Sequence, residues 1–208
     1  MMNQLNINKM KNLNFKTMRR IAFILLMLLT LSLNAQVKFM GIPVDGSRSK
    51  MEFKLRQKGF RPISETDYLR GEFNGENALV AIETYKKKVY SVSVMFGSYF
   101  GDPFVVRTGY GARTVKEKFN DMVYMFNNNE KYLNIGFLIG EPLDPMIDND
   151  EDIEYQIMYN NKKYHAYYRQ IDDEKSNVVH FGIVGSDGDY YIVLKYENLD
   201  NRPDGEDF

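Results

Sequence analysis

Residues 68–96, YLRGEFNGENALVAIETYKKKVYSVSVMF, contain three runs rich in β-branched and aromatic residues. Two turn signals separate these runs: Asn74-Gly75 and three lysines at 86–88. Asn-Gly tolerates the positive φ angles of a type I′ turn, so this dipeptide indicates a hairpin. We therefore predict a three-stranded antiparallel meander over this stretch.

The third run alternates between apolar and polar residues. Val92, Val94 and Phe96 share one face, whereas Ser91 and Ser93 lie on the other. A period of two places one face of a strand against a core and the other towards solvent. We therefore predict that Val94 is buried, that Ser93 is exposed, and that a helix covers the apolar face.

The composition is that of a globular chain. Its 208 residues are 44% hydrophobic, which is enough for a real core, and a single domain is the first expectation at this length. The sequence contains neither Cys nor Trp. The absence of Cys excludes disulfides, thiolate nucleophiles and Cys-ligated metals.

The first 35 residues have the pattern of a secretory signal peptide. Their only charges are basic and precede an apolar run over 21–33, which is followed by Asn34-Ala35-Gln36. This order, with a small residue at the cut, is typical of such signals. The run is shorter than the ~20 apolar residues of a bilayer-spanning helix, so we predict cleavage after Ala35, with an uncleaved anchor as the alternative. Residues 1–17 precede the compact signal as an N-terminal extension.

Cleavage predicts an exported protein, periplasmic or extracellular, with no remaining transmembrane segment. Residues 36–208 hold 22 basic and 28 acidic residues, a formal charge of −6. A net negative charge argues against nucleic acid or an anionic membrane as the partner.

Residues 36–197 are predicted to form a single α+β domain with two parts, 37–98 and 104–197. The first part begins with a strand over 37–44. A helix over 47–58 follows, with Ser49 and Glu52 as a capping box and Ser47 as the rival cap, and then comes the meander.

The second part is predicted to begin with a short strand over 104–106. A helix over 114–126 follows, started by a capping box of Thr114 and Glu117. Four strands are expected at 154–159, 163–171, 177–184 and 190–197, and an acidic, flexible tail at 198–208. The predicted fold is therefore α+β, with antiparallel meanders packed against two helices. The helix-plus-meander order occurs twice, as in a tandem duplication.

The start of the predicted mature chain, FMGIPVDG at 39–46, resembles a group of uncharacterised secreted proteins of Bacteroidetes. Lys58-Gly59-Phe60 and LRGEFNG at 69–75 also match that group. The resemblance covers residues 37–96 and implies export and an α+β fold, without an activity. The order of helix then strands is also similar to the folds of β-lactamase inhibitors and outer-membrane assembly factors, a similarity at the level of fold alone.

No motif for catalysis or metal binding is present in the sequence. His165 and His180 are the only histidines, and each lies in a predicted strand without the clustered partners that nucleophilic or metal sites need. The alternating acids Asp148, Asp150, Asp152 and Glu154 resemble a calcium loop. An EF-hand requires Gly at its sixth position and Glu at its twelfth, and Ile153 and Tyr159 stand there, so a solvated acidic loop is favoured. We therefore predict no catalytic residue, metal site or cofactor.

Tyrosine is unusually frequent near the C-terminus. Eight of the 15 tyrosines lie in the last third of the predicted mature chain: Tyr155, Tyr159, Tyr164, Tyr167, Tyr168, Tyr190, Tyr191 and Tyr196. Tyr presents rigid apolar area with a polar tip, which suits binding faces, although it is also a common strand residue. Tyr167, Tyr190, His165 and Arg169 are the predicted binding residues, with Tyr167 and Tyr190 exposed.

These observations favour an exported, non-enzymatic binding or inhibitory module of the cell envelope or exterior. Its expected partner is a protein or a glycan. The alternative is a hydrolase that acts on glycan or cell-wall material through paired carboxylates, for which Glu72 and Glu83 are the candidates.

Overall fold

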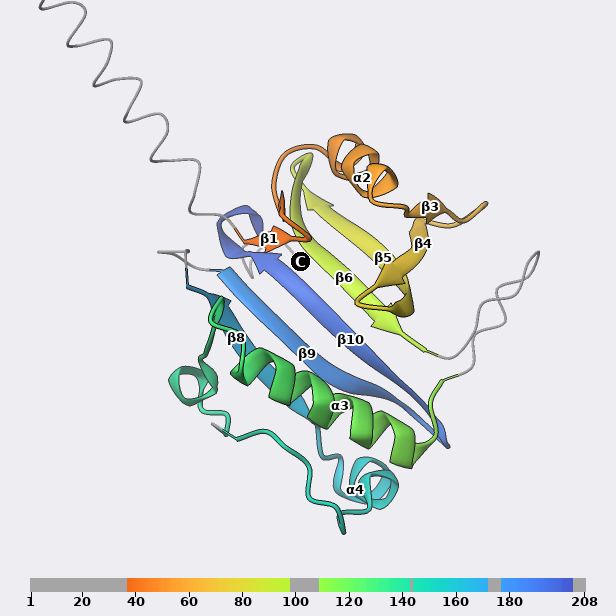
Figure 1. Cartoon of the computed structure of the whole chain (residues 1–208), viewed down its shortest axis with the longest axis vertical. Coiled ribbons are helices and arrows are strands. Elements are labelled where there is room, and N and C mark those ends of the chain that lie inside the picture. Colours follow the sequence, from red (N-terminus) through yellow and green to blue (C-terminus); the bar gives the residue numbers. More distant parts are fainter. Residues whose placement is uncertain (1–36, 98–108, 143, 172–176, 204–208) are drawn as a thin grey trace, which may run out of the picture. The chain divides into compact units, whose positions relative to one another are not determined.

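The structure is a computed structural model that describes residues 37–97, 109–142, 144–171 and 177–203 (Figure 1). The predicted signal peptide with its cleavage point and the predicted strand at 104–106 lie outside these residues.

An antiparallel sheet of eight strands forms the centre of the fold, in the order β3-β4-β5-β6-β10-β9-β8-β7. These strands are β3 (Arg61–Pro62), β4 (Tyr68–Phe73), β5 (Glu76–Tyr85), β6 (Lys88–Phe96), β7 (Tyr132–Asn134), β8 (His165–Gln170), β9 (Asn177–Ser186) and β10 (Asp189–Asn198). A separate small hairpin pairs β1 (Lys38–Phe39) with β2 (Ile42–Pro43). The helices are α2 (Arg48–Gln57), α3 (Ala112–Asn127) and α4 (Ile153–Asn160), with 3-10 turns η1 (Gly136–Ile139) and η2 (Leu199–Asn201). The predicted α+β class is confirmed.

The meander predicted for residues 68–96 is β4-β5-β6. Asn74 and Gly75 have φ angles of 53° and 82° in the first turn. Lys86 and Lys87 have φ angles of 46° and 67° in the second. Two successive positive φ angles are the geometry of the type I′ turn, whose twist matches that of the strands it joins.

The alternation along β6 is confirmed for the apolar face, but the two serines on the other face, Ser91 and Ser93, are buried rather than exposed. Val94 is completely buried, as predicted. Ser93 is only 9% exposed, although it lies on the opposite face. It stands between Ala81 of β5 and Lys195 of β10. A small side chain on a central strand is covered by its longer neighbours, so facing away from the helices did not make Ser93 exposed.

The helix-plus-meander order occurs twice along the chain. α2 leads into β3, β4, β5 and β6, and α3 leads into β7, β8, β9 and β10. The last strands of the two halves pair with each other in the middle of the sheet, with Val94 opposite Leu194. The second half differs by the segment between β7 and β8, which contains η1 and α4.

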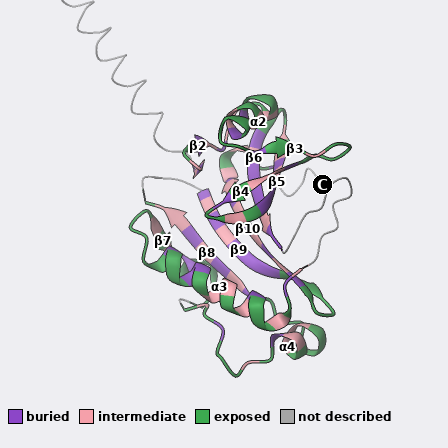
Figure 2. Cartoon of the chain, turned by 45° about the vertical axis from the view of Figure 1, so that its right-hand side comes forward, coloured by how far each residue is buried: buried purple, intermediate pink, exposed green. Residues whose placement is uncertain are grey.

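Both α2 and α3 pack on one face of the sheet (Figures 1 and 2). α3 buries Phe119 and Phe126, whose rings lie 5.3 Å from the ring of Phe181 on β9. α2 buries Met51 and Leu55. The predicted amphipathic helices are confirmed, because residues at helical spacing form the buried stripe of each.

The helix starts differ from those predicted. Ser47, the rival cap, is the N-cap of α2, and its side chain accepts from the backbone N–H of Lys50. α3 begins two residues before the predicted start, with Gly111 as its N-cap and no side-chain cap, so the capping box at Thr114 is wrong. The single strand predicted for 37–44 is a hairpin, since Met40 and Gly41 take positive φ angles and turn the chain.

The strand predicted for 154–159 is wrong, because this segment is the helix α4. Asp152 caps its start, accepting a hydrogen bond from the backbone N–H of Tyr155 at 3.1 Å. Asn161 ends it in the left-handed conformation. Ile153 and Ile157, one helical turn apart, both pack on the core. The acidic residue that resembled part of a calcium loop is therefore a helix cap.

The start of the predicted flexible tail is packed on the domain instead. Asn198 donates from Nδ2 to the carbonyl of Val44, and Asn201 donates from Nδ2 to the carbonyl of Val89. These bonds hold η2 against the first half of the chain.

Candidate functional site

None of the described helices covers the second face of the sheet. Along β10 the side chains alternate strictly, so that residues 190, 192, 194 and 196 are buried under the helices and residues 191, 193, 195 and 197 are half-buried on the other face. The same alternation along β8 and β9 brings His165, Tyr167, Arg169 and His180 to this face. We refer to it as the helix-free face.

Both histidines of the chain lie next to Tyr167 on the helix-free face. The ring centroids of Tyr167 and His180 are 5.4 Å apart and their planes differ by 9°. His165 stacks on Tyr167 from its own strand, with centroids 5.9 Å apart and an angle of 23°. His180 lies 3.2 Å from Glu197, measured from Nε2 to Oε2. We call these four residues, His165, Tyr167, His180 and Glu197, the His/Tyr cluster.

Gly182 makes room for the imidazole of His165. The two residues are opposite each other in the β8–β9 register. A Cβ atom at position 182 would lie 2.8 Å from Nδ1 of His165 and 2.8 Å from the carbonyl oxygen of Tyr164. Nδ1 itself is buried and has no hydrogen-bond partner among the residues that the structure describes. The ring is therefore held by packing rather than by polar contacts at that nitrogen.

The ionisable groups of the cluster influence one another. The hydrogen bond from His180 lowers the pKa of Glu197, and the charges of His180 and Arg202 act in the same direction against burial. Burial lowers the pKa of His165, and the charge of His180 adds to this effect. Burial also raises the pKa of Tyr167, with further contributions from Glu141 and Glu197. At neutral pH the carboxylate of Glu197 is therefore ionised, the imidazole of His165 is neutral and the phenol of Tyr167 keeps its proton.

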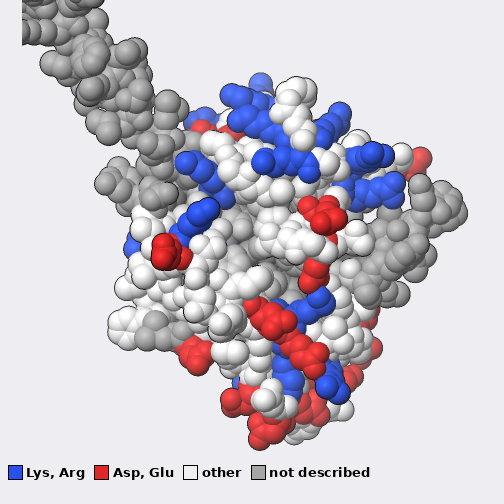
Figure 3. Space-filling model, in the orientation of Figure 1, with Lys and Arg blue, Asp and Glu red and all other residues white. Residues whose placement is uncertain are grey.

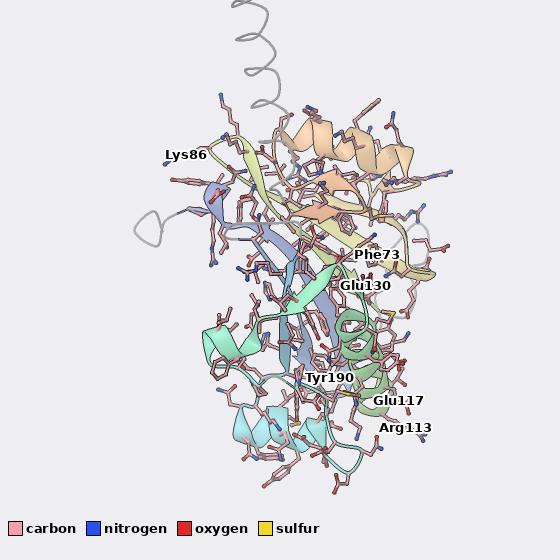
Figure 4. The ribbon with its side chains drawn as sticks, turned by 60° about the vertical axis from the view of Figure 1, so that its left-hand side comes forward. Phe73, Lys86, Arg113, Glu117, Glu130 and Tyr190 are labelled. Atoms are coloured by element: carbon pink, nitrogen blue, oxygen red, sulfur yellow. The ribbon has the colours of Figure 1, made fainter. Side chains whose placement is uncertain are left out.

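The structure brings three of the four predicted binding residues together and separates the fourth. Tyr167, His165 and Arg169 share the helix-free face of β8. Tyr190 is completely buried, so its predicted exposure is wrong. β10 already begins at Asp189, which turns Tyr190 to the helix side, and its backbone exchanges hydrogen bonds with Tyr110. Figure 4 shows Tyr190 within the domain, near α3.

The other tyrosines divide between core and surface. Tyr164, Tyr168, Tyr190 and Tyr196 are buried, Tyr155 and Tyr159 are exposed, and Tyr167 and Tyr191 are half-buried. Four of the eight tyrosines thus pack in the core, as expected of a residue that is common in strands.

His180 and Glu197 are cluster members that the sequence did not single out as binding residues. His180 is separated from Tyr167 by 13 positions and Glu197 lies on a third strand. Their shared signal is alternation: each lies between buried neighbours in its strand, which places it on the face opposite the core. Only the pairing of β8, β9 and β10 makes them neighbours.

The geometry does not supply a nucleophile with its base. Within the described ranges, His180 pairs with the carboxylate of Glu197, and no serine or threonine hydroxyl is hydrogen-bonded to either imidazole. The same part of the chain contains no group of three potential ligands arranged for a metal ion. Nucleophilic catalysis requires a nucleophile in hydrogen-bond reach of its base.

The carboxylates predicted for the hydrolase alternative do not form a pair. Glu72 faces Asn77 across β4–β5, and Glu83 lies six residues further along β5, about 20 Å away at the usual strand rise. Glu83 and Glu197 are closer, since both flank Ser91 in one cross-strand row, which separates their Cα atoms by about 10 Å. A glycosidase acid needs a raised pKa, whereas the pKa of Glu197 is lowered.

Two surface hollows lie away from the cluster. One follows β3 and β4 and includes Arg61 and Arg70. The other lies between α3 and the β4–β5 turn and includes Phe73 and Lys118, on the side where Figure 4 shows Phe73. The His/Tyr cluster lines neither hollow, and its His180 and Glu197 side chains are 21% and 13% exposed.

No protein family, curated protein or solved structure matches this chain detectably. Among the residues that the structure describes, no helix is long and apolar enough to cross a membrane. The fold and the candidate site therefore define the protein as an antiparallel α+β domain that displays an aromatic and ionisable cluster on its helix-free face.

Proposed function

We propose that this protein is an exported, non-catalytic binding module whose partner docks on the helix-free face around the His/Tyr cluster. The observation that carries the proposal is the stack of His165, Tyr167 and His180, which stands on a sheet face that none of the described helices covers.

The cluster has the composition of a binding surface. Tyr is enriched at interfaces because it offers rigid area and a polar tip at a small cost in conformational entropy. Tyr167 is held further by the two neighbouring imidazoles, and His180 is held by Glu197. A partner would therefore meet groups that are already ordered, which reduces the entropy lost on binding.

A binding role fits these residues better than hydrolysis does. The closest candidate carboxylates, Glu83 and Glu197, are separated by Ser91, and Glu197 is engaged by His180. Incubation of the purified protein with peptidoglycan or glycan fragments is expected to release no product, and turnover would support the hydrolase instead.

Site-specific photo-crosslinking in the native cells tests the proposal. A benzophenone amino acid replaces Tyr167 in one strain and Tyr124, a 65% exposed residue of α3, in the control strain. We expect a discrete adduct with the partner from position 167 and none from position 124. Adducts from position 124 alone, or from neither position, would contradict a partner on the helix-free face.

A further inference from the structure

The outer side of α2 is cationic and has an aromatic side chain at its centre. Phe53 is 61% exposed, whereas Met51 and Leu55 face the sheet and are buried. Lys50 and Arg56 lie three residues to either side of Phe53, so they adjoin it on the outer face of the helix. Between positions 47 and 61 the chain holds six basic residues, Arg48, Lys50, Lys54, Arg56, Lys58 and Arg61, and one acidic residue, Glu52.

Most of these charges are not neutralised within the protein. Glu52 and Asp67 engage Arg48, and Glu52 also lies 3.7 Å from Arg56. The other four, Lys50, Lys54, Lys58 and Arg61, form no ion pair in the part of the chain that the structure describes. A field of this sign is therefore available to an external anion.

The β5–β6 turn extends the cationic surface. It contains Lys86, Lys87 and Lys88, all of them exposed. The backbone N–H of Val89 donates to the carbonyl of Gly46 at 2.8 Å, which fixes the turn beside the start of α2. Figure 4 shows Lys86 at the same end of the domain as α2, and Figure 3 shows Lys and Arg gathered over that end. We call α2 and this turn the cationic end.

Acidic residues gather around α4, at the other end of the domain (Figure 3). They are Asp148, Asp150, Glu151, Asp152 and Glu154. The net charge of −6 expected for residues 36–208 is thus an average over two ends of opposite sign. A negative net charge does not exclude an anionic membrane as the partner of a protein that can turn its cationic end towards it.

We propose that the cationic end docks on an anionic phospholipid bilayer, with Phe53 entering the headgroup region and α4 directed away. Interfacial helices combine Lys and Arg with an aromatic side chain, because the bilayer offers anionic headgroups and, a few ångströms deeper, an apolar layer. A bilayer satisfies both kinds of side chain here at once. An acidic protein or a soluble polyanion is the competing outcome in the experiment.

Single-tryptophan variants test the docking and its orientation. The chain has no Trp, so Phe53→Trp on α2 and Tyr159→Trp on α4 each introduce one reporter. Both replaced side chains are exposed, 61% and 72%, so the domain should remain folded, as thermal melts will show. With vesicles of equal parts phosphatidylglycerol and phosphatidylcholine, the Trp at position 53 should shift its emission to the blue, and the Trp at 159 should not. Vesicles of phosphatidylcholine alone should shift neither.

Charge-reversal variants test whether vesicle binding depends on the cationic end or on the net charge of the protein. Lys50→Glu with Lys54→Glu, introduced into the Phe53→Trp protein, should weaken vesicle binding about tenfold or more. Lys131→Glu with Lys163→Glu changes the net charge equally at exposed positions away from α2 and should weaken it far less. Salt at about 1 M, where the Debye length is ~3 Å, should release the protein.

An equal blue shift at positions 53 and 159, or equal effects of the two charge reversals, would overturn the proposal. So would binding to a soluble polyanion such as heparin without any response to the anionic vesicles. The partner on the helix-free face is tested separately by the crosslinks from position 167, so the failure of one proposal does not imply failure of the other.

Discussion

The ring of Tyr167 on β8 is nearly parallel to the ring of His180 on β9, with centroids 5.4 Å apart and planes within 9° of each other. Its ring is also nearly parallel to that of His165, with centroids 5.9 Å apart. The two imidazoles restrain the phenol ring, and its hydroxyl group can donate and accept hydrogen bonds. The cluster therefore suits a partner that offers hydrogen-bonding groups, as a protein surface does.

Replacement by Ala should destabilise the domain far more at Tyr190 than at Tyr167. Tyr190→Ala removes a completely buried ring and should cost about 3–5 kcal/mol in the free energy of unfolding. Tyr167→Ala removes two ring contacts at a half-buried position and should cost about 1 kcal/mol. Urea titrations measure both values. Equal costs would mean that the two tyrosines do not lie on opposite faces of the sheet.

The stability of the domain should fall between about pH 7 and pH 5, and His165 should be a cause. Burial and the charge of His180 lower its pKa in the folded state. The unfolded chain, with a pKa near 6.5, therefore binds more protons in this window, and stability is lost as the pH falls through about 6.5. Glu141 acts in the opposite direction and Lys163 in the same direction.

His165→Asn should flatten the loss of stability between pH 7 and pH 5. Urea titrations at several pH values measure the slope for the wild type and the variant. The lowered pKa of Glu197 should add a second loss in both proteins, at lower pH, as the pH falls below about 4.5. An unchanged slope between pH 7 and pH 5 would show that His165 is not the responsible group.

The substitution Val94→Asp should unfold the domain. Val94 is completely buried, and an unpaired carboxylate there costs several kcal/mol, comparable with a total stability of ~5–15 kcal/mol. Met95→Gln is the matched control, because Met95 is half-buried on the other face of β6 and its replacement should cost at most about 1 kcal/mol. Ser93 is unsuitable as the control since its hydroxyl is buried. Thermal melts decide, and similar losses for both variants would contradict this register.

Removal of the α4 cap should destabilise the domain modestly. Asp152→Ala deletes the side chain that accepts from the N–H of Tyr155, and loss of an N-cap typically costs about 1 kcal/mol. Asp150→Ala removes the same charge from an exposed residue outside the helix and should change stability by less than about 0.5 kcal/mol. If the two variants melt alike, the effect is one of charge rather than of capping.

The fold could be predicted wherever the turn residues and the apolar–polar alternation of the strands indicate the same structure. The meander around Asn74-Gly75 and the strands predicted at 177–184 and 190–197 are examples, because turn residues with positive φ angles and a period of two both specify them. The segment that forms α4 could not be predicted as a helix. Its eight residues are too few to show a clear period, and either a strand or a helix would bury an isoleucine there. Tertiary packing of Ile153 and Ile157 decided the outcome.

The candidate site could be predicted only in part. Adjacent residues on one strand must alternate, so Tyr167 and His165 could be placed on one face from the sequence. The meeting of His180 and Glu197 with them depends on which strands pair and in which register, and Tyr190 depends on where β10 begins. These are long-range properties that no local pattern contains.

The pairing of β6 with β10 also predicts how the first half of the chain would behave as a separate molecule. Cut away from its other half, α2 with β3 to β6 would expose the edge of β6, and unpaired edges recruit other strands. Val94 lies near the middle of the paired segment of β6 and β10, opposite Leu194. Two copies of that fragment joined edge to edge around Val94 would reproduce the same eight-stranded layout with true rotational symmetry. The chain thus has the strand layout of a two-fold dimer within one polypeptide, and its halves differ in their surfaces: the first carries the cationic end, and the second carries His165 and His180.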